Sequence, residues 1–339
     1  MQPTIRDIAK KVNRSITTVS RALHDYDDVS EETKELVRRA AKEMGYVANK
    51  QAQLLRQQHT DTIGFILPTF GPRFSDPFFS EFLAGIGNAA AEQDYDLLVS
   101  TCPPGAHEMD TYEKFVQSRR VDGFIIVRTR VDDQRIHYLD SIDFPFVAFG
   151  RVPEMEHIPY IDENSELGMR LIVDHLVKLG HRRFACIAPS LTMTFATHRM
   201  KGLKEGLAKH GLGMRPECVL TGDLTEKGGY ERTLELIGLP ERPTAIVACN
   251  DLMAIGAIRA IQDSGLTVGR DISVTGFDDI PISEYVQPSL TTVSQPIYQI
   301  GRSACQMLVD LLNEKEFDRK QILLEPVLMV RHSTGIPIS

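Results

Sequence analysis

From residue 62 onward, short aliphatic runs alternate with longer amphipathic stretches, and this alternation restricts the fold more than any other feature of the sequence. The predicted strands are 62–68, 96–102, 122–127, 144–150, 183–189, 244–250 and 272–279, and the predicted helices are 78–93, 108–119, 165–180, 198–210, 227–238, 251–264 and 297–313. Strands that alternate with helices form parallel sheets whose faces the helices cover. The sequence therefore predicts an α/β fold for this part of the chain.

Two stretches interrupt the alternation and divide the predicted sheets into two lobes. They are 158–168 and 288–296, where we expect the chain to cross between the lobes. The last predicted strands, within 321–334, are far from the first in sequence, so we expect a C-terminal segment to complete each lobe. The predicted boundaries are about 61–161 and 292–322 for the N-terminal lobe, and about 162–291 and 323–339 for the C-terminal lobe.

The first sixty residues are predicted to form three short helices. Thr4, Ser15 and Ser30 are natural N-cap residues, and each precedes apolar side chains at helical spacing. Asn13 and Gly45 suit the left-handed conformation that often ends a helix. Two helices joined by a short turn, with a third packed on them, make a helix-turn-helix. We assign this head to residues 1–47.

The head differs in charge from the rest of the chain. Residues 1–60 hold 11 Lys/Arg and 8 Asp/Glu, whereas the whole chain has a formal net charge of -8. A basic head on an acidic body is typical of a nucleic-acid-binding arm joined to a domain with another task. The second predicted helix points four side chains away from its small core, namely Ile16, Thr17, Ser20 and Arg21. Short hydroxyls can approach phosphates and arginine can bond a guanine edge, although a helical cap with a polar outer face would show the same pattern.

Two stretches of the head, "TIRDIAKKVNRSITTVSRAL" and "VSEETKELVRRAAKEMGYVAN", resemble the DNA-binding head of the lac-repressor (LacI/GalR) family of bacterial transcription regulators. The resemblance implies three side chains that read bases in the major groove and four that hold phosphates. The implied base-reading residues are Ile16, Thr17 and Arg21, and the implied phosphate-binding residues are Thr4, Ser15, Thr18 and Ser20. The chain departs from the family in the turn, where "VNRS" replaces the usual Ala-Gly-Val-Ser.

Residues 48–60 join the head to the α/β part of the chain. On composition alone this polar segment is a linker or a marginal helix, because so short a helix is unstable by itself in water. The family resemblance implies a hinge helix, which orders when two copies pair over the minor groove of DNA. Leu55 would then wedge between base steps, with Arg56 beside it.

Polar residues stand at the carboxyl ends of three of the predicted strands, at Arg151, Asn250 and Asp278. Ligands of parallel sheets bind beyond the carboxyl ends of the strands, and two facing lobes would bring those ends into one cleft. Each of these residues can also be a helix cap or a turn residue. The family resemblance covers the whole chain and implies a periplasmic-binding-protein-like core in which Arg199, Asn250 and Asp278 bind a small effector.

Arginine and carboxylate side chains suit a sugar, because ring hydroxyls accept hydrogen bonds from a guanidinium and donate them to a carboxylate. Four apolar side chains are expected to line the cleft, with core packing as the alternative for each, namely Phe78, Phe79, Phe195 and Leu224. "FGR" at 149–151 resembles family members that answer to glucosides. We therefore expect a mono- or disaccharide effector that contains glucose, rather than a purine.

Three functions fit a two-lobed chain of this kind: a DNA-binding repressor controlled by an effector, a solute-binding protein, and an enzyme that acts on glycosides. A solute-binding protein would need an export signal and no helical head. No GxSxG, HExxH, P-loop or GxGxxG motif stands in the context that a catalytic site needs, so we predict no catalytic residue, no cofactor and no metal. The expected partners are operator DNA, the effector and a second copy of the chain, because a homodimer matches a palindromic site.

Other features concern the cellular location and the oligomeric state. No apolar signal segment precedes the head, and no window approaches 18 uninterrupted apolar residues, so we expect a cytoplasmic protein with no membrane partner. No leucine heptad follows the last strand, and a tetramer is therefore not expected.

His181 is expected to favour the end of a helix through its charge. The scattered cysteines are expected to be reduced and mostly buried, namely Cys102, Cys186, Cys218, Cys249 and Cys305.

Overall fold

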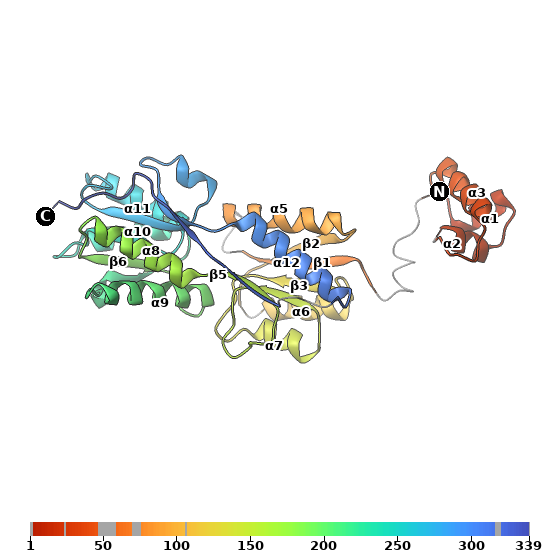
Figure 1. Cartoon of the computed structure of the whole chain (residues 1–339), viewed down its shortest axis with the longest axis horizontal. Helices are drawn as coiled ribbons and strands as arrows, with labels where there is room; N and C mark the ends of the chain where they lie inside the picture. Colours follow the sequence, from red (N-terminus) through yellow and green to blue (C-terminus); the bar gives the residue numbers. More distant parts are fainter. Residues whose placement is uncertain are drawn as a thin grey trace. The chain divides into compact units, whose positions relative to one another are not determined.

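The computed structural model of the chain describes residues 3–23, 25–46, 59–69, 76–105, 107–315 and 320–338, which belong to two compact units (Figure 1). The first unit, Met1–Thr60, contains the head, and the second, two-lobed unit is Asp61–Ser339. Among the described residues, none of the helices is both long enough and apolar enough to span a lipid bilayer.

The head consists of three helices, α1 (Ile5–Val12), α2 (Ile16–Leu23) and α3 (Glu31–Met44). Hydrogen-bonding side chains at the helix starts fix these boundaries, since the first N–H groups of a helix need acceptors. The Oγ of Ser15 accepts a hydrogen bond from the backbone N–H of Thr18 at 3.0 Å. Asn13 (φ 50°) and Gly45 (φ 63°) end α1 and α3 in the left-handed conformation. The predicted helix-turn-helix is confirmed.

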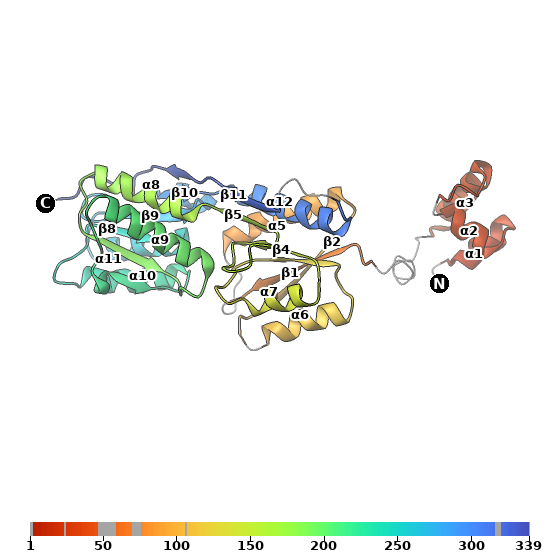
Figure 2. The ribbon, with the colours of Figure 1, turned by 60° about the horizontal axis from the view of Figure 1, so that its bottom comes forward.

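The first lobe contains a six-stranded parallel sheet in the order β11-β5-β4-β3-β1-β2. Its strands are β1 (Thr62–Pro68), β2 (Asp96–Cys102), β3 (Gly123–Ile126), β4 (Phe146–Phe149), β5 (Tyr160–Glu163) and β11 (Gln321–Leu324). Its helices are α5 (Pro77–Glu92), α6 (Glu108–Gln117), α7 (Gln134–Ser141) and α12 (Ile297–Leu312). Because their side chains join different hydrophobic clusters of the sheet, α5 and α12 cover one face, and α6 and α7 cover the other (Figure 2).

The second lobe repeats this architecture with a sheet in the order β12-β10-β9-β8-β6-β7. Its strands are β6 (Phe184–Ala188), β7 (Val219–Thr221), β8 (Ala245–Ala248), β9 (Ser273–Asp278), β10 (Thr291–Ser294) and β12 (Val327–Met329). Its helices are α8 (Ser165–Lys178), α9 (Thr194–Lys209), α10 (Glu226–Ile237) and α11 (Asp251–Asp263). The sheet is parallel except at one edge, where β12 runs antiparallel to β10. The predicted α/β class with parallel-dominated sheets is confirmed.

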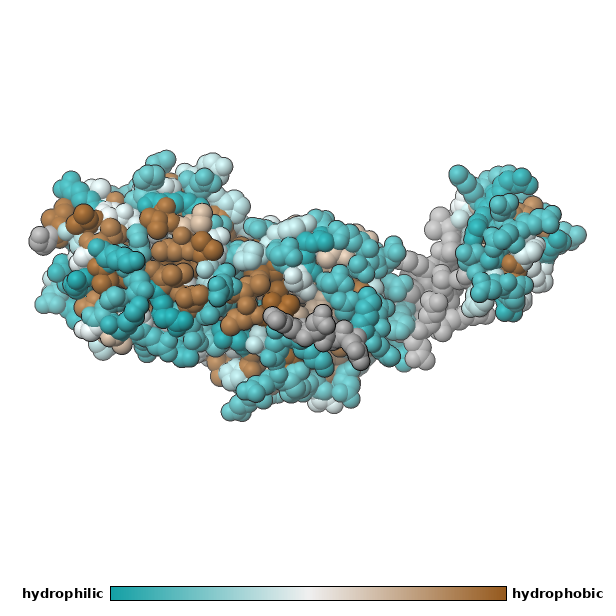
Figure 3. Space-filling model, in the orientation of Figure 1, coloured by the Kyte–Doolittle hydropathy of each residue, from teal (hydrophilic) through white to brown (hydrophobic). Residues whose placement is uncertain are grey.

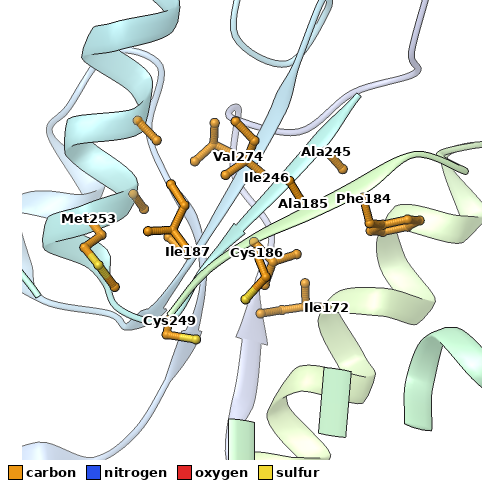
Figure 4. Close-up of a cluster of buried hydrophobic side chains, with 14 of the residues drawn as sticks. Ile172, Phe184, Ala185, Cys186, Ile187, Ala245, Ile246, Cys249, Met253 and Val274 are labelled. Atoms are coloured by element: carbon orange, nitrogen blue, oxygen red, sulfur yellow. The ribbon is translucent and has the colours of Figure 1, made fainter. Parts of the chain in front are cut away.

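The strands of the second lobe are buried in a core of aliphatic, aromatic and sulfur-containing side chains (Figure 4). Cys186 on β6 and Cys249 after β8 lie in this core, where Figure 4 shows them with Ile172 and Met253. All five cysteines of the chain are free and buried. They pack as small apolar residues, in agreement with the prediction.

The chain passes between the lobes three times. It leaves the first lobe after β5, returns to it after β10, and ends with β11 in the first sheet and β12 in the second. Because β5 pairs with β4, the chain stays in the first lobe until Glu163. Because β10 pairs with β9, it stays in the second lobe until Ser294 and then returns to the first. The first two crossings therefore lie within the predicted stretches 158–168 and 288–296, slightly after the boundaries predicted at about 161 and 292. Helix α7 and strands β5, β7 and β10 are absent from the predicted elements.

Candidate functional site

Helix α2 presents a polar face on the head. Val19 and Ala22 are buried against α1 and α3, whereas Ile16 is 47% exposed. Ile16, Thr17 and Arg21 are exposed, and Thr18 and Ser20 are half-buried. The three side chains that the sequence assigned to base reading thus lie on the outside of one helix.

Three predicted phosphate-binding hydroxyls lie at helix N-termini, where free N–H groups favour an anion. The hydroxyl of Thr4 donates to the carboxylate of Asp7 at 2.6 Å at the start of α1. The hydroxyls of Ser15 and Thr18 are 2.8 Å apart at the start of α2. The predicted hinge residues Leu55 and Arg56 lie outside the described residues.

Arg21 has partners that the sequence analysis missed. Its Nη2 lies 2.7 Å from the Oδ2 of Asp28, and its guanidinium carbon lies 5.3 Å from the centre of the Tyr26 ring. Both partners come from the turn between α2 and α3. Arg21 and Asp28 line a groove together with six other residues, namely Ser15, Thr17, Thr18, Val29, Ser30 and Thr33.

In the two-lobed unit, a pocket is lined by side chains from both lobes. The first lobe contributes Asp76, Phe78, Phe79, Val127, Arg128, Thr129, Phe149, Gly150, Asp162 and Glu163, and the second contributes Phe195, Arg199, Leu224, Asn250 and Asp278. Gln295, where the chain returns to the first lobe, completes the lining. Seven of the eight predicted effector-binding residues line this pocket; Arg151 does not.

Arg199 on α9 is the best-connected side chain of the pocket. Its Nη2 lies 3.2 Å from the Oδ1 of Asp278 and 3.3 Å from the Oε1 of Glu163, and its Nη1 donates to the carbonyl of Cys249. The guanidinium also lies on the ring of Phe277, 3.6 Å from its centre. Burial works to lower the pKa of Arg199, but the carboxylates of Asp278 and Glu163 raise it above its usual value. A permanent cation of the second lobe therefore pairs with Asp278 of its own lobe and with Glu163 of the first lobe.

An aromatic wall faces this polar cluster. Phe78 stacks on Phe149 with ring centres 5.8 Å apart and an interplanar angle of 18°, and it meets Phe79 edge to face. Phe79 is 2% exposed, so it contributes mainly to the core of the first lobe. Beside the wall, Arg128 pairs with Asp76 at 3.1 Å. Flat apolar rings next to buried hydrogen-bonding groups suit the C–H face and the hydroxyls of a sugar.

Asn250 holds two parts of the second lobe together. Its Oδ1 accepts from the N–H of Met253 at 3.1 Å and so caps α11, and its Nδ2 donates to the carbonyl of Leu224 at 3.1 Å. Leu224 has a left-handed backbone (φ 68°). Asn250 is thus a helix cap that also lines the pocket.

Sequence reasoning missed Glu163 and Gln295. Glu163 ends β5, in a stretch where no strand was predicted. The Nε2 of Gln295 donates to the Oδ1 of Asp278 at 2.7 Å, whereas its Oε1 is buried with no hydrogen-bond partner in the described structure. A buried acceptor without a partner is costly, so this oxygen is suited to a ligand hydroxyl. Nothing in the local sequence of Gln295 marks it.

Arg151 departs from the prediction that it lines the cleft. Gly150 has φ 116°, which redirects the chain after β4, and a Cβ there would lie 2.2 Å from the hydroxyl oxygen of Thr129. Gly150 itself therefore lines the pocket. The side chain of Arg151 instead pairs with Asp162, with Nε 2.8 Å from Oδ2.

Backbone hydrogen bonds join the lobes beside the pocket. The N–H of Val131 donates to the carbonyl of Thr192 at 2.9 Å, and the N–H of Thr194 donates to the carbonyl of Thr129 at 2.9 Å. The hydroxyls of Thr129 and Thr194 are 2.5 Å apart. These contacts connect the loop after β3 to the start of α9, the helix that carries Arg199.

His181 does not have the charged role that was predicted for it. Its ring is buried, with Nδ1 3.0 Å from the hydroxyl of Thr244 and Nε2 3.0 Å from the carbonyl of Gly335. Burial lowers its pKa to about 4, so the ring is neutral at pH 7. Within the described ranges, no three His, Cys, Asp or Glu side chains are grouped as a metal site requires.

Comparisons with known proteins extend these observations. Residues 4–49 match the model for "Bacterial regulatory proteins, lacI family", and residues 173–334 match the periplasmic binding protein-like domain. The HTH-type transcriptional regulator CelR of Thermobifida fusca is 32% identical over 98% of both chains. The transcriptional repressor CytR of Escherichia coli K12 is 32% identical over 98% of this chain and 96% of its own.

Solved structures give the same result. A lac repressor dimer bound to operator and the anti-inducer ONPF superposes with a TM-score of 0.87 at 30% identity, covering 99% of this chain and 100% of its own. A CelR–cellobiose complex has a TM-score of 0.76 at 31% identity, covering 98% and 99%. The relatives are transcriptional regulators rather than enzymes. The head, the two-lobed unit and these matches together place the chain in the lacI family of bacterial regulatory proteins.

Proposed function

We propose that the chain is a repressor that binds an approximately palindromic operator as a homodimer, under the control of a sugar held in the pocket. The observation that carries this proposal is the pairing of buried Arg199 with Asp278 and Glu163, opposite the rings of Phe78 and Phe149. Adjacent sugar hydroxyls can accept from a guanidinium and donate to carboxylates, while the rings cover the apolar face of the sugar.

A glucoside is the favoured effector. The "FGR" stretch resembles regulators that answer to glucosides, and one solved relative is a CelR–cellobiose complex. Arg128 and Arg199, which line the pocket, each already have a carboxylate partner, so a neutral polyol fits better than an anion. The chain would act in the cytoplasm, without catalysis.

In this proposal, residues 1–47 form the DNA-reading head and 48–60 form the hinge. Ile16, Thr17 and Arg21 read bases, while Thr4, Ser15, Thr18 and Ser20 contact phosphates. Leu55 and Arg56 engage the minor groove. A sugar between the lobes changes their relative angle, and this change alters the pairing of the two hinges.

The proposal is tested in two steps with the full-length protein. Selection from random duplexes should enrich a sequence with two-fold symmetry, and a thermal-shift screen should find a mono- or disaccharide that stabilises the protein. A sugar at 100 times its Kd stabilises the native state by about 2.7 kcal/mol. Enrichment of no sequence, together with no shift for any saccharide, would contradict the proposal.

A further inference from the structure

The ion pair between Arg21 and Asp28 lies on the surface where the head is expected to meet DNA. The two side chains are 47% and 51% exposed, and the contact joins the last turn of α2 to the loop before α3. So exposed a pair contributes little to the stability of the head, because water and salt screen it. We therefore expect the ion pair to act mainly on the conformation of the Arg21 side chain.

A base-reading arginine must place two parallel N–H groups on the O6 and N7 atoms of a guanine. A free arginine side chain has several rotatable bonds, and fixing them costs conformational entropy each time DNA binds. Asp28 bonds Nη2, and the ring of Tyr26 lies near the guanidinium. The guanidinium carries five N–H donors, so one pair of parallel donors is still available for a base.

We propose that Asp28 is a positioning residue that holds Arg21 ready to read a guanine, an inference that rests on the proposed function of the head. The carboxylate also repels phosphates, since it lines the groove with Ser15, Thr17 and Thr18. Asp28 therefore has two effects: through Arg21 it raises the affinity for the operator relative to other DNA, and through its charge it weakens the phosphate contacts that every duplex makes. These two effects have opposite signs, which distinguishes positioning from a general effect of charge.

The test compares Asp28→Asn with Asp27→Asn, which removes the same charge one residue away. For the full-length protein, fluorescence anisotropy gives the Kd for the selected operator and for a scrambled duplex at one salt concentration. We expect Asp28→Asn to lower the ratio of operator to scrambled affinity by about fivefold to tenfold, as part of the discrimination of one bidentate contact. Binding to the scrambled duplex should stay the same or tighten, and Asp27→Asn should leave the ratio unchanged.

A double-mutant cycle locates the effect. In an Arg21→Ala background, Asp28→Asn should no longer change the ratio, because the side chain that it positions is gone. An equal change of the ratio in both backgrounds, or equal effects of the variants at 27 and 28, overturns the inference. A higher operator affinity for Asp28→Asn overturns it too, since Asp28 would then compete with DNA for Arg21. If the wild-type protein itself shows no discrimination, the proposed function fails, and this outcome is distinct from the others.

Discussion

The α2 surface of the head and the pocket use ionic groups in opposite ways. In the head, Arg21 and Asp28 are 47% and 51% exposed, whereas in the pocket the side chains of Arg199 and Glu163 are 5% and 2% exposed. The face of the head in Figure 3 is mostly hydrophilic, and the two-lobed unit shows several apolar patches beside its polar surface. The members of an exposed ion pair can exchange partners at little cost in free energy. Removing one member of a buried pair strongly destabilises the folded protein, because the other charge stays buried without a partner. The head is therefore suited to transient contacts in water, and the pocket to a fixed geometry.

Among the substitutions that test this contrast, Arg199→Met should have the largest effect. It leaves Asp278 and Glu163 buried without their cation, so we expect the two-lobed unit to lose about 3–5 kcal/mol of unfolding free energy. Arg21→Met, the matched change in the head, should cost less than about 0.5 kcal/mol. Urea unfolding followed by circular dichroism measures both variants. Similar small losses for the two variants would show that the pocket cluster is not a tightly coupled buried network.

The pH dependence of stability should also differ between the two regions. The pKa of His181 is lowered from 6.5 to about 4, so the unfolded chain binds the proton first as the pH falls. The stabilisation is complete above pH 6.5 and is lost between about pH 6.5 and 4, by roughly 2–3 kcal/mol. In the head, hydrogen bonds from Thr4 lower the pKa of Asp7, whose contribution to stability is lost only in more acidic solution.

Calorimetry of His181→Gln between pH 7 and pH 4.5 checks this prediction. The variant should lack the part of the acid-induced loss that comes from His181, roughly 2–3 kcal/mol, while His137→Gln, at an exposed site, should keep the profile of the wild type. An unchanged pH profile for His181→Gln would assign the acid sensitivity to other groups.

Asp278→Asn tests the pocket without removing volume. The variant keeps one oxygen acceptor but loses the charge that pairs with Arg199, so we expect sugar affinity to fall about tenfold to a hundredfold. Operator affinity in the absence of sugar should be unchanged. The neighbouring Asp279 pairs with Arg331 outside the pocket, and Asp279→Asn is therefore the matched control. Titration calorimetry with the sugar from the thermal-shift screen measures the sugar affinity of both variants. Equal losses of affinity would contradict a specific role of Asp278 in binding the effector.

Leu55→Ala should have the smallest of these effects. We expect about tenfold weaker operator binding, because the variant lacks an apolar wedge between base steps, and unchanged sugar affinity. Leu54→Ala gives a neighbouring control of the same size. Operator affinities that are the same for both variants and the wild type would remove the wedge from the proposed mechanism.

The head was predictable because its determinants are local. Thr4, Ser15 and Ser30 cap the helices that directly follow them, and Gly45 ends the last. Asp28 was missed because its contact with Arg21 crosses a turn and leaves no periodic signal. Local hydrogen bonds can be read from a sequence, whereas contacts between elements depend on the angle at which they pack.

In the two-lobed unit, long alternating elements were predictable and short or charged ones were not. Helix α7 escaped prediction because Arg135 is a buried residue that the sequence presents as a surface charge. It is 1% exposed and pairs with Asp133 and Glu108. Strand β7 has three residues, too few to show a pattern.

The pocket was predictable where the family resemblance supplied residues, and elsewhere only in outline. Strand ends pointed to Asn250 and Asp278, because polar groups there meet in a cleft. Gln295 lies where the chain returns to the first lobe, and only the tertiary structure brings it to Asp278. Arg151 pairs with Asp162 instead of lining the pocket, because the backbone turns at Gly150, which a linear pattern does not reveal.

The central claim is that sugar in the pocket and operator on the heads influence each other through one protein. The most direct measurement is the Kd for operator with and without saturating sugar, together with the Kd for sugar with and without saturating operator. Linkage requires the two affinities to change by the same factor, and we expect this factor to lie between about 5 and 150. A sugar that binds the pocket tightly but leaves the operator Kd unchanged would contradict the account.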